Sequence, residues 1–120
     1  MANILLADDD AAVRDLVRRA LAADGHNVHV TQDGIEAFDY FGGRSGDVDL
    51  LVTDVDMPQL DGLALAEKVL AVRPNLPIVL MSGFSDQLDR ADALHAKHLV
   101  SISKPFTLEQ IKQLVKKALT

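Results

Sequence analysis

The stretch Leu50-Leu51-Val52-Thr53-Asp54 decides the fold, because a short run of apolar and β-branched residues leads directly into a carboxylate. Such a run is typical of a strand that is buried on both faces of a parallel sheet. Three similar runs also lead into reactive groups: residues 4–7 into Asp8-Asp9, residues 77–81 into Ser82-Gly83, and residues 99–103 into Lys104-Pro105. Because a parallel sheet brings the carboxyl ends of its strands to one edge, we expect these groups to share a cleft.

Longer stretches with the period of amphipathic helices separate these runs. A further strand is expected at residues 26–30, and helices are expected over residues 63–72 and 85–96. The first helix stops at Gly25, and its expected core face consists of Val13, Leu16, Val17, Ala20 and Leu21. The last helix is expected to turn inward Leu108, Ile111, Val115 and Leu119. Capping boxes are expected to open two of the helices, at Asp33 with Glu36 and at Thr107 with Gln110.

Short strands that alternate with helices imply right-handed crossovers and a parallel sheet with helices on both faces. The sequence therefore predicts an α/β fold, a flavodoxin-like doubly wound sheet of five parallel strands in the order 2-1-3-4-5, with five helices. In this order the topological switch lies between strands one and three, so the chemistry should follow those two strands. Asp8-Asp9 and Asp54 stand there, whereas strand two ends in Thr31-Gln32. All 120 residues are expected to form one domain.

The composition limits the classes of partner and location. With 48% hydrophobic and 25% charged residues, the chain has the make-up of an ordinary soluble globular protein. Its net charge of −6 argues against a nucleic-acid partner, because phosphate backbones are bound by clustered Lys and Arg. No apolar run reaches the roughly 18 residues of a membrane helix, and no signal-peptide pattern begins the chain. Together with the lack of cysteine, this predicts a cytoplasmic protein with no nucleic-acid or membrane partner.

Asp8, Asp9 and Asp10 form an acidic run ahead of the first expected helix. Acids at this place can cap the helix and complement its dipole, which explains Asp10 and at most one more. The surplus carboxylates face Asp54, and at 4 Å and an effective dielectric constant near 20 each such pair costs about 4 kcal/mol. A hard divalent cation relieves this repulsion, and Mg²⁺ favours one or two carboxylates together with waters and a phosphate. The sequence therefore predicts a magnesium site.

The other groups at this edge carry weaker individual signals. Ser82-Gly83 alone is an ordinary turn pair, and Asp61 is interpreted as the cap of the helix at residues 63–72. Lys104 is a stronger indication, because a buried amine needs an anionic partner and Pro105 restricts the backbone beside it.

These motifs make the chain resemble the receiver domains of two-component response regulators over essentially its whole length, residues 1–120. The resemblance is carried by Ile4-Leu5-Leu6-Ala7-Asp8-Asp9-Asp10, by Thr53-Asp54-Val55-Asp56-Met57-Pro58 with Asp61-Gly62, by Met81-Ser82-Gly83, and by Ser103-Lys104-Pro105-Phe106. Each motif is modest alone, but all four in this order and at this spacing are specific.

The resemblance implies a role for each residue of the expected cleft. It implies that Asp54 accepts a phosphoryl group from the histidine of a sensor kinase or phosphotransfer protein. It further implies that Mg²⁺ is held by Asp8, Asp9, Asp54 and the backbone carbonyl of Asp56. Lys104 would contact the phosphoryl oxygens beside a cis Lys104-Pro105 bond, and Ser82 would hydrogen-bond the phosphoryl group. Such a protein is not an enzyme beyond its own phosphoryl transfer and dephosphorylation.

The chain departs from the family pattern at Ser101. Many receivers carry Tyr or Phe at this place, three residues before the Lys, and that ring turns inward on phosphorylation. With Ser101 an aromatic gate cannot operate, so the expected switch runs through Ser82, Gly83 and the helix at residues 85–96. That helix has the thinnest apolar stripe, which predicts that it shifts most easily.

The expected output is a protein contact that depends on phosphorylation, since no output domain follows the last helix. The expected surface is formed by the helix at residues 85–96, the last strand and the last helix. The chain is also loosely similar to stand-alone alphaproteobacterial receivers that control ClpXP-type proteolysis, which implies a protease component as a downstream target.

Two other classes of function are compatible with parts of the sequence. Asp54-Val55-Asp56 is similar to the start of haloacid-dehalogenase phosphatases, although that motif usually follows the first strand of a longer core. A phosphorylation-independent adaptor could also keep the fold and lose the chemistry. The complete set of Asp8, Asp9, Asp54, Ser82 and Lys104 argues against an adaptor.

Overall fold

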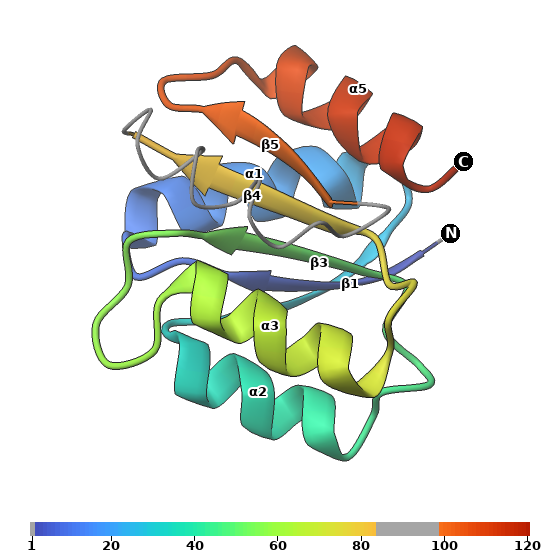
Figure 1. Ribbon diagram of the computed structural model, residues 1–120. Helices are drawn as coiled ribbons and strands as arrows, with labels where there is room; N and C mark the ends of the chain where they lie inside the picture. Colours follow the sequence, from blue (N-terminus) through green and yellow to red (C-terminus); the bar gives the residue numbers. More distant parts are fainter. Residues whose placement is uncertain (1, 84–98) are drawn as a thin grey trace.

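Five parallel strands form one sheet in the order β2-β1-β3-β4-β5, as predicted from the flavodoxin-like pattern. The computed structural model describes residues 2–83 and 99–120. Within them the strands are β1 (Asn3–Ala7), β2 (Asn27–Thr31), β3 (Leu50–Asp54), β4 (Ile78–Ser82) and β5 (Leu99–Ser103). The register pairs Ala7 with Thr53 and Asp54 with Met81. The strand ends that carry reactive groups therefore lie at one edge, to which the arrowheads point in Figure 1.

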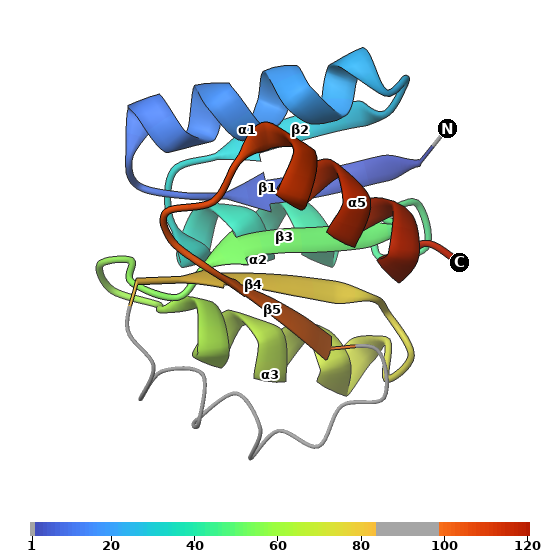
Figure 2. The same ribbon diagram turned by 90° about the horizontal axis from the view of Figure 1, so that it is seen from above.

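Helices cover both faces of this sheet. The described residues contain four of them: α1 (Ala11–Ala23), α2 (Gly34–Gly42), α3 (Gly62–Val72) and α5 (Leu108–Ala118). α2 and α3 pack together on one face, while α1 and α5 pack together on the other (Figures 1 and 2). The fifth expected helix, at residues 85–96, lies outside the described residues, as does its predicted ease of movement.

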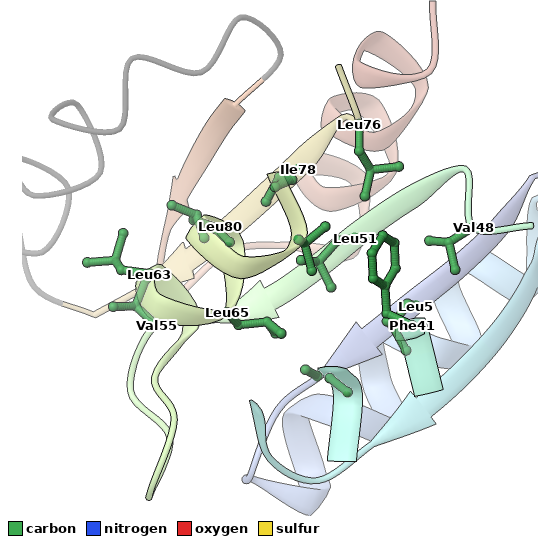
Figure 3. Packing of buried hydrophobic residues seen from close by; sticks show 14 of the residues in the cluster. Leu5, Phe41, Val48, Leu51, Val55, Leu63, Leu65, Leu76, Ile78 and Leu80 are labelled. Atoms are coloured by element: carbon green, nitrogen blue, oxygen red, sulfur yellow. The ribbon is translucent and has the colours of Figure 1, made fainter. Parts of the chain in front are cut away.

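Two apolar cores, one on each face, hold the layers together. β3 and β4 are buried along their whole length, as the continuous apolar runs predicted. On the α2–α3 face, Phe41 lies among Leu5, Val48 and Leu51 (Figure 3). On the other face, Val17, Leu21, Ile111 and Val115 pack against β1, β3 and β4. The central strands are therefore fixed from both sides, which gives the sheet edge a rigid support.

Each described helix begins at a residue whose side chain accepts a backbone hydrogen bond. Asp10, Asp33 and Asp61 cap α1, α2 and α3, with Asp–amide distances of 2.8–2.9 Å. Thr107 and Gln110 form a complete capping box at α5, which confirms that prediction. Gly25 follows α1 with a φ of 88°, a left-handed conformation that favours glycine.

Two expected core residues are exposed instead. Leu16 is 43% exposed because it lies about 100° around the helix from its buried neighbour Val17, away from the sheet. Leu108 is 42% exposed because it is the first residue of α5, almost a turn ahead of Ile111, the first buried residue of that helix. β2 also begins and ends one residue later than predicted, so the buried Thr31 belongs to it.

Among residues 2–83 and 99–120, none of the helices combines the length and the apolar character that crossing a membrane requires.

Two glycines of α2 should respond oppositely to the same substitution. A Cβ on Gly34 would lie 2.2 Å from the carbonyl oxygen of Leu60, whereas a Cβ on Gly42 would meet nothing within 4 Å. We expect Gly34→Ala to lower the free energy of unfolding by about 1–3 kcal/mol through overpacking. Gly42→Ala should leave it unchanged or raise it by up to about 1 kcal/mol, because alanine restricts the unfolded chain. Urea unfolding of both variants checks this; equal effects would contradict the close packing at Gly34.

Candidate functional site

Side chains from three parts of the chain meet at the carboxyl edge of the sheet, and Ser82 ends its strand at the same edge. Asp8 follows β1, Asp54 ends β3, Ser82 ends β4 and Lys104 follows β5. The Lys104 ammonium lies 3.1 Å from Asp54 Oδ1 and 3.5 Å from Asp8 Oδ2. Asp8, Asp54 and Ser82 are at most 4% exposed, whereas Lys104 is half-buried. The predicted cleft is therefore a buried pair of carboxylates that share one amine.

The backbone of β5 delivers Lys104 to this place. Its amide donates to the carbonyl oxygen of Ser82 at 2.7 Å, which continues the pairing of Ser82 with Ser103. The Lys104-Pro105 peptide bond is cis, as the family resemblance implied.

Asp8 is tightly held except at one oxygen. Its Oδ1 accepts a hydrogen bond from the Asp10 amide at 2.9 Å, and its own amide donates to the Thr31 carbonyl at 3.3 Å. Its buried Oδ2 accepts no hydrogen bond within the described part of the chain. The Lys104 ammonium at 3.5 Å is an ion-pair partner at a distance too long for a strong charge-assisted hydrogen bond. This oxygen is thus available to a cation.

Asp8, Asp9 and Asp54 form a set of carboxylates that suits a hard divalent cation. Each offers one oxygen, and these oxygens all lie within 4.8 Å of one another. Asp8 and Asp54 are buried, whereas Asp9 is exposed, so the set opens toward solvent. Oxygen-only donors with one orphaned buried atom fit Mg²⁺ better than a metal that prefers nitrogen or sulfur.

Asp56 contacts the site with its backbone. Its backbone amide donates to the Asp54 carboxylate, which places its peptide unit beside the cluster. Its side chain is exposed. The structure thus brings Asp56 next to the other three acids, and coordination by its carbonyl remains a prediction.

The charges of the cluster are unbalanced. Burial, and after it the neighbouring Asp8, raise the pKa of Asp54 from 3.8 to about 6, against the lowering effects of Lys104 and the Asp56 backbone. Burial also raises the pKa of Asp8, against the Asp10 amide and Lys104. Burial lowers the pKa of Lys104, but Asp8 and Asp54 outweigh it, so the net shift is upward. One ammonium cannot neutralise two buried carboxylates, so the pocket favours further positive charge.

The predicted switch residues occupy different environments. Ser82 is buried at the end of β4, next to β3, while Gly83 is exposed and a Cβ there would meet nothing within 4 Å. Ser101 is exposed on β5 and pairs with Leu80, two positions before Ser82 reaches the edge. Of these three residues, only Ser82 is buried at the edge where the acids lie.

Three residues that support the site were missed from the sequence. A Cβ on Gly62 would lie 2.1 Å from the carbonyl oxygen of Asp54, so only glycine fits where α3 begins. Thr31 donates from its hydroxyl to the Leu6 carbonyl at 2.8 Å and is fully buried. Arg14 donates from Nη1 to the Asp8 carbonyl at 2.9 Å. The Asp61-Gly62 pair could have indicated a tight turn; nothing in the sequence indicates the other two contacts.

The family profile described as response regulator receiver domain matches residues 4–116. The chain belongs to the response regulator receiver domain family. Response regulator MprA of Mycobacterium sp. strain KMS is 37% identical over 109 residues, which are 91% of this chain and 46% of that protein. MprA of Mycobacterium avium strain 104 is 38% identical over the same length. The chain spans about half the length of these curated relatives.

Solved receiver domains share the fold over nearly the whole chain. The receiver domain of NtrX from Brucella abortus is 29% identical with a TM-score of 0.86, covering 98% of both chains. The receiver domain of the hybrid histidine kinase CckA is 30% identical with a TM-score of 0.84, covering 98% of this chain and 99% of that one. As a receiver domain, the chain is a signalling module of two-component systems.

The raised pKa of Asp54 makes a prediction about stability and pH. Its pKa of about 6 in the folded protein lies above its ordinary value of 3.8, so ionisation penalises folding as the pH rises from about 4 to above 6. We expect Asp54→Asn to raise the free energy of unfolding of metal-free protein by about 2–3 kcal/mol at pH 7.5. This gain should shrink toward pH 4.5. Urea unfolding at several pH values measures it, with the exposed Asp39→Asn as control; a gain that does not vary with pH would contradict the prediction.

Proposed function

We propose that this receiver domain accepts a phosphoryl group on Asp54 from a phosphohistidine of a sensor kinase or phosphotransfer protein. The observation that carries the proposal is the 3.1 Å contact between Asp54 and Lys104, together with two more carboxylates in position for a shared cation. The lack of cysteine suits the reducing cytoplasm in which we propose that the exchange occurs.

The chemistry requires little more than positioning and charge neutralisation. An Asp54 carboxylate oxygen forms a bond to phosphorus while the phosphorus–nitrogen bond of the phosphohistidine breaks, and the leaving imidazole nitrogen takes up a proton. Lys104, 3.1 Å from Asp54, would neutralise the phosphoryl oxygens that approach Asp54. Asp8, Asp9, Asp54 and the Asp56 carbonyl would hold Mg²⁺. When bound, Mg²⁺ supplies positive charge to oxygens that gain negative charge during the transfer.

Phosphoryl transfer to Asp54 should be stoichiometric and should need a divalent cation. With a small phosphoramidate as donor and Mg²⁺ present, we expect one phosphoryl group per chain by intact-protein mass spectrometry, and none after chelation. Asp54→Asn should abolish the label, because amides are poor nucleophiles. Asp56→Asn is the matched control: it lies in the same loop with an exposed carboxylate and should still be labelled.

Incubation with a phosphate ester, together with the labelling assay and a test of Mg²⁺ binding, separates the rival classes. A haloacid-dehalogenase-like phosphatase would turn over a phosphate ester many times and would need Asp56 as its general acid. A phosphorylation-independent adaptor would show neither labelling nor Mg²⁺ binding. Either result would refute the proposed function.

We also propose that phosphorylation controls binding of a downstream protein, with a protease component as one candidate. A phosphoryl group on Asp54 adds strong acceptor oxygens next to the buried Ser82. A hydroxyl drawn toward these oxygens would shift the adjoining Gly83, where a Cβ would meet nothing within 4 Å.

Partner binding should therefore depend on the state of Asp54. We expect pull-downs with beryllofluoride-treated protein to recover partners that untreated protein does not. Asp54→Ala should give the same set with and without beryllofluoride. Identical partners for treated and untreated native protein would contradict phosphorylation-controlled contact.

A further inference from the structure

We propose that Arg14 is a positioning residue that fixes the peptide unit between Asp8 and Asp9 and thereby sets the direction of Asp9 toward the shared cation. This inference rests on the proposed function, in which these carboxylates hold Mg²⁺. Within residues 2–83 and 99–120, the Arg14 side chain forms no hydrogen bond or ion pair with Asp54 or Lys104, so it would act only through the turn that carries the two acids.

The contact joins the first turn of α1 to the end of β1. The Arg14 amide donates to the Asp10 carbonyl at 2.9 Å, the first hydrogen bond of the helix. From there the half-buried side chain reaches back, and its Nη1 donates to the Asp8 carbonyl oxygen at 2.9 Å. A charged donor makes this bond stronger than a neutral one.

The bond fixes the peptide unit between the two acids. The carbonyl of Asp8 and the amide of Asp9 share one rigid plane, so holding the oxygen also sets the direction in which Asp9 leaves the turn. The Asp8 carboxylate is fixed separately, by the Asp10 amide at Oδ1. With these atoms held, Asp8 Oδ2 is the oxygen left without a hydrogen bond within the described residues, and Asp8 is a member of the carboxylate cluster.

If Arg14 acted only through its charge, its removal would change the Mg²⁺ affinity in the opposite direction. A positive charge near the cluster repels Mg²⁺, so its removal would tighten binding if charge were the whole effect. Loss of positioning weakens binding instead, because groups that orient metal ligands typically change affinity 10–100-fold when removed. A purely structural role would change the stability of the protein and leave the affinity of the folded form unchanged.

Mg²⁺ titration of the full chain by calorimetry tests the proposal. We expect Arg14→Met to weaken Mg²⁺ binding about tenfold and Arg14→Lys, which keeps a charged donor, to recover part of the loss. Arg18→Met is the matched control: Arg18 lies one turn further along α1, paired with the surface Asp15 at 3.0 Å, and its removal should change the affinity less than twofold. In metal-free protein, the NMR signal of the Asp9 amide should shift in Arg14→Met and stay in place in Arg18→Met.

The outcomes separate the two hypotheses. If the unsubstituted chain fails to bind Mg²⁺, the proposed function is refuted and the inference falls with it. If the unsubstituted chain binds Mg²⁺ and folded Arg14→Met binds equally well or more tightly, the inference alone is overturned. Should Arg14→Met fail to fold, Arg14→Gln, which keeps a neutral donor, takes its place with the same expected direction and the same criterion.

Discussion

Two buried carboxylates that share one ammonium are the interaction on which the rest of this structure depends. Lys104 lies 3.1 Å from Asp54 and 3.5 Å from Asp8, and it leaves the pair with an excess of negative charge. Burial disfavours the charged form of Asp54, and repulsion from Asp8 adds to this effect, so the pKa of Asp54 is about 6. An arrangement that costs stability in this way is typical of functional sites, and here the excess negative charge favours binding of a cation.

The apolar layers supply the rigidity that such a site requires. β3 and β4 are fully buried, so Asp54 and Ser82 end strands that cannot move independently of the cores. Gly62 lets α3 begin in contact with the Asp54 backbone, and Thr31 ties the end of β2 to β1. The acids are therefore held close together by packing at several points, and the repulsion between them is not relieved by movement apart.

Because the chain belongs to the receiver domain family, this site is part of a two-component signalling module. The chain corresponds to about half of the curated response regulators that it matches. In this chain the small, exposed Ser101 stands at the position where an aromatic side chain would be able to turn inward. Ser82 is the buried hydroxyl on the strand next to Asp54, and we propose that a signal from Asp54 begins there.

The sequence by itself determined the strand order, the helix caps and the edge at which the reactive groups meet. These follow from short-range signals, since apolar runs define strands and a capping residue lies within three residues of the amide that it binds. Only the tertiary structure decided which apolar residues are exposed, as Leu16 and Leu108 show, and which residues support the acids. Gly62, Thr31 and Arg14 contact backbone atoms of other segments, and for Thr31 and Arg14 nothing in residue type or spacing indicates these contacts. Local chemistry therefore identified the carboxylates, whereas long-range packing fixed how closely and in which direction they face one another.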